Sequence, residues 1–320
     1  MSIVIIGGAG FIGSRLVKNF LDNDEDVLVL DNLCRGKKEY LSKDLKPEKL
    51  KFEDMDVSNL SDVYNILKIF NDRNPVSVVW HLAANSDIPA GISDINVDYK
   101  NTFMTTFAIL ETMKRLNLKE LVFSSSSAVY GDHGENVVLT ENSGPLLPIS
   151  NYGAMKLASE AIISAATECY LDHSWIFRFP NVIGTPATHG IIYDLIGKLK
   201  NNPEKLPVLG NGTQQKAYLH VDELIEGMLF VFKNAKDKMN LYNIGPDDRG
   251  CRISDIAEAV VRIVSPDAEI VYGNESRGWI GDVPKFYYNI DKIKKLGWHP
   301  KLSSKEAVER AVTEIYKQEW

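Results

Sequence analysis

Cysteine, basic charge and long hydrophobic runs are scarce in this chain, and each shortage excludes a class of protein. The three cysteines, Cys34, Cys169 and Cys251, are odd in number and far apart, which argues against a disulfide framework or a zinc site. The 43 acidic residues outnumber the 36 basic ones, and the formal net charge is -7. The chain as a whole is therefore not a polyanion binder, and we expect no nucleic-acid partner.

Apolar stretches are too short for a membrane protein. No segment reaches the roughly 18 consecutive apolar residues expected of a membrane span. The opening MSIVIIGG has a short apolar run and no basic leader, so we expect no secretory signal. Three unpaired cysteines fit a reducing compartment. We predict a cytoplasmic protein with no membrane partner.

Short apolar runs alternate with helical spacing through the first half of the chain. The composition, 44% hydrophobic and 25% charged, is that of a globular protein that can bury a large core. The expected strands cover residues 3–6, 26–31, 51–57, 76–84, 120–127 and 174–184, and the expected helices cover residues 11–21, 61–70, 103–116 and 152–170. Because parallel strands need such crossovers, this pattern predicts an α/β fold with a doubly wound parallel sheet.

A glycine-rich turn follows the first expected strand. Gly7, Gly10 and Gly13 have the spacing G-x-x-G-x-x-G and open the first expected helix. Glycine permits a tight turn and lets the backbone approach a pyrophosphate, which the first amides of the helix then face. An ordinary strand-to-helix turn is the alternative for these glycines alone.

Asp31 favours the dinucleotide interpretation. It ends the second expected strand, eighteen residues after Gly13. A carboxylate there would bind the adenosine ribose hydroxyls and repel a 2′-phosphate, so NAD is favoured over NADP. Arg35, Lys37 and Lys38 follow, and we interpret them as a solvated loop.

Two further strand ends supply candidate cofactor contacts. Asp56 and Val57 either frame the adenine or form an ordinary strand end. Leu82, Ala83 and Ala84 end the fourth expected strand, where small or apolar residues either let the backbone lie against a cofactor or belong to the core.

Tyr152 and Lys156 lie four positions apart in an expected helix and so share one face. An ammonium beside a phenol stabilises its phenolate, and a positive nicotinamide ring would lower the pKa of the phenol further. We therefore expect Tyr152 to act as a general base on a sugar hydroxyl and Lys156 to hold the nicotinamide ribose. The serine run at residues 124–127 ends a strand at the edge where parallel sheets bind ligands, or is a polar loop.

Together these residues resemble the extended short-chain dehydrogenase/reductases, in their NAD-dependent nucleotide-sugar epimerase/dehydratase branch, and the 4-epimerases within it. The segments that carry the resemblance span the chain: GGAGFIG, LDNL, HLAA, FSSSSAVYG, YGAMK, RFPNVIG, LHVDEL and GDVP…LGW. The resemblance implies a Rossmann-like sheet with a smaller C-terminal substrate-binding lobe. The implied division is residues 1–180 for NAD, with residues 217–245 returning to that domain, and residues 181–320 mainly for the substrate.

Carried over by position, the resemblance assigns most of the site. Ser126, Tyr152 and Lys156 match the catalytic residues, and Ser126 also faces the substrate. Phe11, Ile12 and Asn32 join the glycines and Asp31 as cofactor-binding residues, and no metal is implied. Ser127 and Ala128 stand where sugar dehydratases have Asp-Glu, which argues against dehydration.

Three residues match positions that contact the sugar nucleotide. They are Asn181, which has a structural alternative as a strand-end cap, Lys216 and Arg277. Lys216 stands where the family usually has arginine and keeps the charge without the two-pronged geometry. Ala217 replaces the aspartate that usually follows, and the spacing of Arg277 from GDVP also departs from the common pattern.

The resemblance therefore implies oxidation at C4 of a nucleotide-diphosphate sugar. We expect a 4-epimerase with a transient 4-keto intermediate that serves surface glycan precursor synthesis, and a homodimer. One alternative is a 4-dehydrogenase that releases the 4-keto sugar from a hexose or heptose substrate. The alternative of another class is a non-catalytic dinucleotide-sensing protein.

Overall fold

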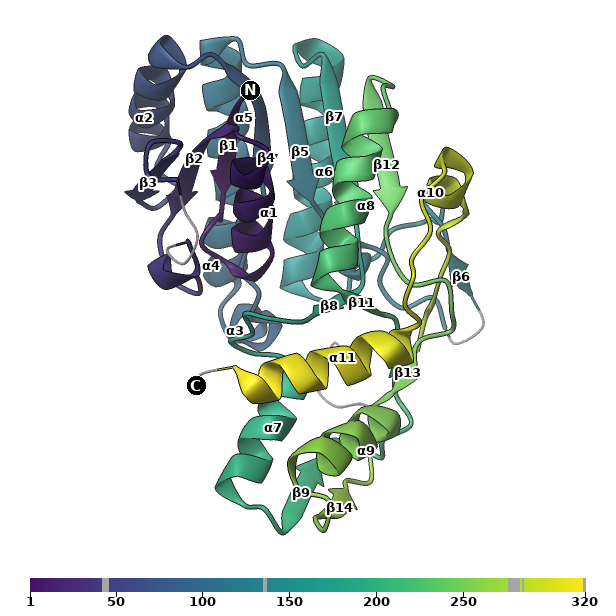
Figure 1. Cartoon of the computed structure of the whole chain (residues 1–320). Helices are drawn as coiled ribbons and strands as arrows, with labels where there is room; N and C mark the ends of the chain where they lie inside the picture. The colour runs from purple at the N-terminus through teal and green to yellow at the C-terminus, as the bar shows by residue number, and fades with distance from the viewer. Residues whose placement is uncertain (42–45, 135–136, 276–282, 284, 319–320) are drawn as a thin grey trace. The chain divides into compact units, whose positions relative to one another are not determined.

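The computed structural model describes the chain except for residues 42–45, 135–136, 276–282, 284 and 319–320. The described chain divides into two compact units. Unit 1 comprises Met1–Val129, Leu147–Arg178 and Val231–Tyr242, and unit 2 comprises Tyr130–Leu146, Phe179–Phe230 and Asn243–Trp320. Helices and strands carry the labels of Figure 1.

Unit 1 is built on a seven-stranded sheet in the order β12-β7-β5-β4-β1-β2-β3. The strands are β1 (Ser2–Ile6), β2 (Asp26–Asp31), β3 (Leu50–Asp54), β4 (Val76–His81), β5 (Glu120–Ser124), β7 (His173–Arg178) and β12 (Met239–Asn243). All pairs from β3 to β7 are parallel. The side chains of β1 are buried along its whole length, as expected of a strand covered on both faces. The predicted doubly wound α/β sheet is confirmed.

Helices cover both faces of this sheet (Figure 1). The main ones are α1 (Phe11–Asp22), α2 (Leu60–Arg73), α5 (Thr105–Leu116) and α6 (Asn151–Cys169), with the short helices α3 (Ile88–Ser93), α4 (Ile95–Asp98), η1 (Lys38–Leu41) and η3 (Ser127–Val129) in the loops. Val4, Leu28 and Leu121 share a core with the apolar faces of α2, α5 and α6. On the opposite face, Phe20 of α1 packs edge-on against Trp80, with ring centroids 5.6 Å apart.

Unit 2 has short two-stranded pairings and a helical core. The strand pairs are β6 (Val138–Leu139) with β15 (Tyr287–Tyr288), β8 (Asn181–Ile183) with β11 (Tyr218–His220), β9 (Lys205–Val208) with β14 (Glu269–Tyr272), and β10 (Gln215–Lys216) with β13 (Cys251–Arg252). The helices are α7 (Ile191–Asn201), α8 (Val221–Asn234), α9 (Ile253–Val264), α10 (Asp291–Leu296) and α11 (Ser304–Lys317), with the last residues of α8 in unit 1. Ile196, Val260 and Val312 join α7, α9 and α11 in one core.

Two expected elements differ from those observed. The expected strand 174–184 is two strands in different sheets, because the chain leaves the main sheet after Arg178 and Pro180 precedes β8. The expected helix 103–116 begins as a π-helical segment, η2 (Tyr99–Met104), and becomes α5 at Thr105. Phe107 on that helix is 44% exposed, so the helix does not bury all of its large apolar side chains.

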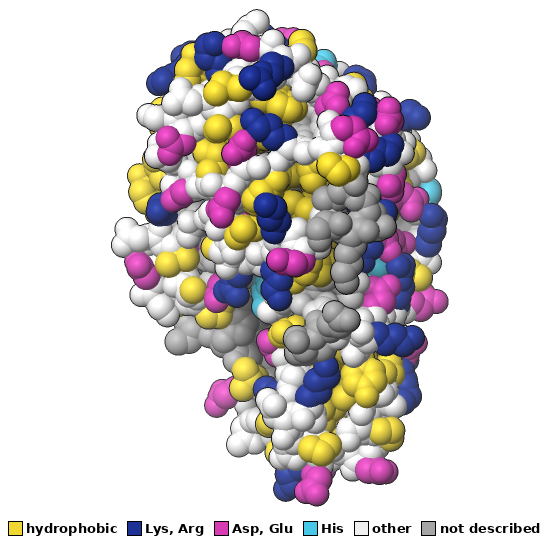
Figure 2. Space-filling view, turned by 60° about the vertical axis from the view of Figure 1, so that its left-hand side comes forward, with side chains coloured by type: hydrophobic (Ala, Val, Ile, Leu, Met, Phe, Trp, Pro, Cys, Tyr) yellow, Lys and Arg dark blue, Asp and Glu magenta, His cyan; other side chains and the backbone are white. Residues whose placement is uncertain are grey.

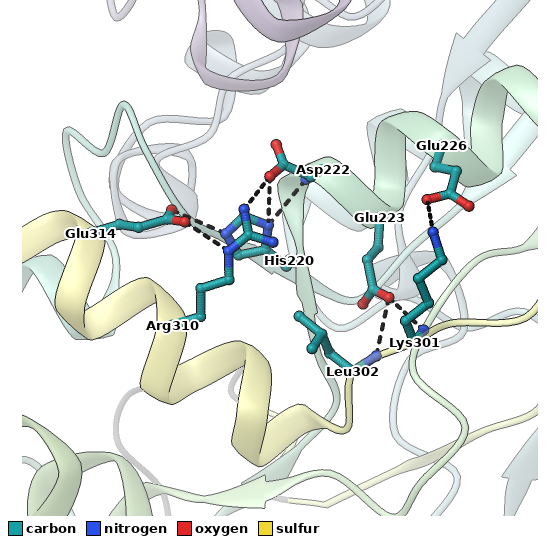
Figure 3. A network of polar contacts seen from close by, with 8 residues as sticks. All are labelled: His220, Asp222, Glu223, Glu226, Lys301, Leu302, Arg310 and Glu314. Carbon is teal, nitrogen blue, oxygen red and sulfur yellow. Dashed lines mark hydrogen bonds and ion pairs between the residues drawn. The ribbon is translucent and has the colours of Figure 1, made fainter.

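His220 lies at the centre of a polar network in unit 2 (Figure 3). The side chain is fully buried, and its Nε2 lies 3.1 Å from Glu314 Oε2 of α11 while its Nδ1 accepts from the amide of Asp222. Arg310 pairs with both Asp222 and Glu314. His220 is therefore an interior residue with a partner for each ring nitrogen.

Two kinds of feature are absent from the described residues. Within the segments that the structure describes, no helix is long and apolar enough to cross a membrane. Over the same residues, no group of three or more His, Cys, Asp or Glu side chains is arranged to hold a metal ion. On the face drawn in Figure 2, acidic and basic side chains are intermixed, in keeping with a modest net charge.

Candidate active site

The turn after β1 requires glycine at two positions. Gly7 has a φ of +79°, and a Cβ there would lie 2.8 Å from the amide nitrogen of Ala83. A Cβ at Gly13 would lie 2.1 Å from the carbonyl oxygen of Gly7. The first contact brings the end of β4 against the turn, and the second packs the start of α1 onto it. Glycine at such a strand-to-helix turn lets the main chain come close to a pyrophosphate, because no Cβ stands in the way.

Asp31 is fixed at the end of β2 by the turn itself. The side chain is 7% exposed, Oδ2 accepts a hydrogen bond from the amide of Ala9 at 2.9 Å, and Oδ1 accepts from the amide of Leu33 at 2.9 Å. Burial raises the pKa of the carboxyl, while both backbone hydrogen bonds act to lower it. Each carboxylate oxygen keeps a further lone pair for a ribose hydroxyl. The turn and Asp31 thus fit a dinucleotide.

The other cofactor candidates lie on the same sheet edge in unit 1. Phe11 and Ile12 open α1, and Asn32 follows β2 with its Oδ1 accepting from the amide of Cys34. The amide of Leu82 bonds to Ile6, and Ala83 touches the glycine turn. Half-buried Ala84 continues the same strand end. The structure therefore brings together the candidates that follow β1, β2 and β4.

Asp56 has partners of its own. Its carboxylate accepts from the amide and hydroxyl of Ser58 and pairs with Lys100 at 2.8 Å. Although burial acts to raise its pKa, these partners lower it. Val57 is buried in the core below α2. This arrangement matches the ordinary strand end, and the role of Asp56 and Val57 toward adenine stays a prediction.

Helix α6 places Tyr152 and Lys156 on one face, as the spacing predicts. Ser150 caps the helix by accepting from the amide of Gly153 at 3.1 Å. Lys156 is 1% exposed, and its Nζ donates to the carbonyl of Ser124 at the end of β5. The same Nζ lies 4.6 Å from the ring centroid of Phe123 and 5.9 Å from that of Tyr152. The ammonium is therefore held between the strand end and the phenol.

The titration of this pair differs from the sequence-based expectation. Burial raises the pKa of Tyr152 to about 12, the hydrogen bond with Ser126 lowers it, and the charge of Asp98 adds to the rise. The expected lowering by Lys156 is wrong for the chain alone, because desolvation dominates. Burial lowers the pKa of Lys156 to about 7, against the opposing charge of Glu160. Lys156 can therefore exchange its proton near neutral pH.

Ser126 connects the serine run to Tyr152. Its hydroxyl hydrogen-bonds the phenol and also accepts from the amide of Ala128 at 3.1 Å. His81, at the end of β4, is fully buried with Nε2 3.0 Å from Thr106 Oγ1, and burial with the nearby charge of Lys156 lowers its pKa to about 3. His81 is thus a neutral interior residue.

Two buried carboxylates near the pair were missed in the sequence. Glu160 accepts from Ser125 and from Arg178, whose Nε and Nη2 lie 2.9 and 2.6 Å away. Asp98 is fully buried and accepts from Asn85 at 2.8 Å. Glu160 follows Tyr152 and Lys156 at the same helical interval, and that spacing was a usable signal. Asp98 had none, because its burial depends on tertiary packing.

The three substrate candidates belong to unit 2. Asn181 is exposed on β8 and its Nδ2 donates to the carbonyl of Ala217 at 3.3 Å, which favours the structural alternative. Lys216 is half-buried on β10. Arg277 lies outside the described residues. Their contacts with a sugar nucleotide stay predictions.

Comparison with known proteins agrees with this geometry. The sequence profile of the NAD dependent epimerase/dehydratase family matches residues 3–245. The UDP-glucose 4-epimerase of Lactobacillus helveticus is 30% identical over 321 residues, covering 94% of this chain and 92% of its own. That of Bacillus subtilis is 27% identical, covering 96% and 94%.

Solved structures agree as well. A crystal structure of a UDP-galactose 4-epimerase covers 100% of both chains with a TM-score of 0.86 and 32% sequence identity. The Thermus thermophilus UDP-glucose 4-epimerase in complex with NAD covers 99% of both chains with a TM-score of 0.85 and 25% identity. The chain belongs to the NAD-dependent epimerase/dehydratase family, and it is an NAD-dependent enzyme of the nucleotide-sugar epimerase type.

Proposed function

We propose that the chain is a nucleotide-sugar 4-epimerase that acts through a transient 4-keto sugar. The observation that carries the proposal is the grouping of Ser126, Tyr152 and buried Lys156 at the sheet edge that holds the glycine turn and Asp31. The relatives described above are named for UDP sugars, so a UDP-hexose is the first substrate to test.

Bound NAD would supply a hydride acceptor whose positive charge lowers the pKa of a nearby phenol. Tyr152 takes the proton of the C4 hydroxyl, and Ser126 aligns that oxygen by hydrogen bonding. Lys156, held by the carbonyl of Ser124, stabilises the phenolate whenever it is protonated. After the ketone has turned, the hydride would return to the other face of C4 and Tyr152 gives the proton back to the C4 oxygen. The net reaction is redox-neutral.

The residues after Ser126 support epimerisation over dehydration. Ser127 and Ala128 lie in η3, and neither side chain carries a carboxyl group that could assist the loss of water. The division into an NAD domain (residues 1–180 with 217–245) and a substrate lobe (mainly 181–320), the homodimer, the cytoplasmic location and a purpose in surface glycan precursor synthesis belong to the same proposal.

The test incubates purified enzyme with a panel of nucleotide sugars and follows C4 configuration and enzyme-bound NADH together. An inverted C4 without accumulated NADH supports the epimerase. Accumulated NADH with a released ketone would establish the 4-dehydrogenase instead, and no reaction of any sugar nucleotide would favour the dinucleotide sensor.

Tyr152→Phe gives the matching residue test. The variant removes the base and keeps the ring, so we expect turnover to fall by about 100-fold or more. Tyr316→Phe, at an exposed tyrosine of α11, is the control and should retain activity. Full activity of Tyr152→Phe on an accepted substrate would contradict the assigned base.

A further inference from the structure

An ion pair joins two loops that the motifs treat separately. Arg35 follows β2, and Asp87 precedes α3 in the loop after β4. The Arg35 Nη2 donates to the Asp87 Oδ2, and the two side chains are 41% and 36% exposed. The sequence motifs place Arg35 in a solvated loop and assign no function to Asp87.

The Arg35 end is attached to the glycine turn. Gly36 packs so closely that a Cβ there would lie 2.7 Å from the carbonyl of Ala9, and the amide of Lys37 donates to that carbonyl at 3.1 Å. Ala9 in turn donates its amide to Asp31. The backbone beside Arg35 is therefore fixed to the turn.

The Asp87 end is attached to the interior. Its amide donates to Asn85 Oδ1 at 3.0 Å, and its carbonyl accepts from Asn85 Nδ2 at 2.8 Å. Asn85 is buried, and its own amide donates to Thr102. The second carboxylate oxygen of Asp87 caps α3 by accepting from the amide of Ala90 at 3.1 Å.

The sheet order decides what the ion pair crosses. Strand β1 lies between β4 and β2, and all three are parallel, so their carboxyl ends meet at one edge. A link between the loops after β2 and β4 must pass the end of β1, where the glycine turn lies (Figure 1).

We propose that Arg35 and Asp87 form a clasp that retains the dinucleotide bound at the glycine turn. Backbone contacts already fix the chain beside Arg35 and beside Asp87. Closing the clasp therefore costs little additional conformational entropy. Retention matters for the proposed epimerase, on which this point rests, because the hydride must return to the same sugar. Asp87 is a positioning residue that acts through Arg35.

The test measures NAD release from the holoenzyme with no sugar nucleotide present. Holoenzyme is diluted into ethanol and alcohol dehydrogenase, which convert released NAD into NADH, and the absorbance gives the release rate. The variants are Arg35→Gln, Asp87→Asn and the pair together. Asparagine keeps the α3 cap while it removes the charge. Asp72→Asn, which breaks the exposed Lys68–Asp72 pair on α2, is the matched control.

We expect each single variant to release NAD about fivefold faster, the size of one well-formed exposed ion pair. The double variant should release NAD no faster than either single variant. As added salt screens the ion pair, the ratio of each variant's release rate to that of wild type should fall toward one. Unfolding midpoints of the apo proteins should be unchanged.

Three outcomes would overturn the clasp: release rates equal to wild type, additive effects in the double variant, or faster release from Arg35→Gln alone, which would mean that Arg35 contacts the cofactor without Asp87. Since release is measured without turnover, failure of the 4-epimerase proposal and failure of the clasp are separate results.

Discussion

Tyr152 and Lys156 have titration behaviour that the free amino acids do not have. Burial raises the pKa of the phenol to about 12 and lowers that of the ammonium to about 7, so the two values move apart. In the chain alone the phenol is protonated at neutral pH and Lys156 is the group that exchanges a proton there. For Tyr152 to act as a base near neutral pH, its phenolate must therefore be stabilised further once the cofactor is bound.

Ser126→Ala tests the hydrogen bond that favours the Tyr152 phenolate. That bond lowers the pKa of Tyr152, so its loss raises the pKa. Since the phenolate is the active form, the acidic limb of the kcat profile should move to higher pH. At neutral pH kcat should fall by about 10- to 100-fold, the worth of a hydrogen bond to a charged group.

The control for this variant is the next serine. Ser127→Ala in η3 should leave the pH profile of kcat in place. A Ser126→Ala enzyme with lower kcat and an unmoved acidic limb would mean that Ser126 acts on the substrate alone.

Sequence and structure agree on this site where the signal is local. The glycine turn, Asp31 and the pair Tyr152 and Lys156 could be predicted from the sequence, because their spacing alone places them. The pKa of Tyr152 and the burial of Asp98 were not, because both depend on residues that meet only in the fold.

Helix α11 shows how an element is held by charge. Arg310 and Glu314 project from it toward Asp222, in the first turn of α8, and His220, the last residue of β11 (Figure 3). Burial acts to raise the pKa of Glu314, but His220 and Arg310 outweigh it and lower the pKa to about 2. A carboxylate with a lowered pKa stabilises the fold above its unfolded value, and that contribution is lost as pH falls through the folded value.

Glu314→Gln should therefore reduce the free energy of unfolding at pH 7 by about 2 to 3 kcal/mol. The deficit should shrink as pH falls from about 4.5 toward 2, where wild type also becomes protonated. Urea unfolding at pH 7 and at acid pH measures it.

Glu309→Gln on the same helix removes only an exposed pair with Arg262 and should cost under about 0.5 kcal/mol. Equal losses for the two variants, or a deficit that does not change with pH, would contradict the role of Glu314.

Elements were predicted well where one local pattern decides them. The expected helix 11–21 matches α1 (Phe11–Asp22) to within one residue, and its apolar residues recur on one face. The expected strand 174–184 was wrong as a single strand, because apolar character continues across Pro180 while the pairing partner changes from β5 to β11. The π-helical segment Tyr99–Met104 leaves no mark in apolar spacing.

At the scale of the whole molecule, the homodimer stays a prediction, and exposed apolar side chains bear on it. Phe107 of α5 is 44% exposed, and Ile95 and Tyr99 of the preceding helical turns are 52% and 46% exposed. Large apolar side chains gathered on neighbouring elements favour a protein partner. A second copy of the chain is the partner that the proposed homodimer supplies.

Phe107→Lys should convert the proposed homodimer into a monomer, because it places a charge in an apolar contact. Size-exclusion chromatography with light scattering measures the mass. Ile69→Lys, at a residue of α2 with a similar exposure of 45%, should leave the mass unchanged. A monomeric wild type, or a dimeric Phe107→Lys protein, would contradict the proposal.

Unit 1 is assembled from three separate stretches of chain, and this order constrains its biogenesis. Strand β12, the outer neighbour of β7, comes from the third stretch, Val231–Tyr242. A nascent chain that has not yet reached this stretch has every other strand of the sheet but leaves one side of β7 unpaired, which is a template for aggregation. A nascent chain stalled before residue 231 would therefore be prone to aggregate. Its binding to chaperones should decrease once β12 has emerged from the ribosome.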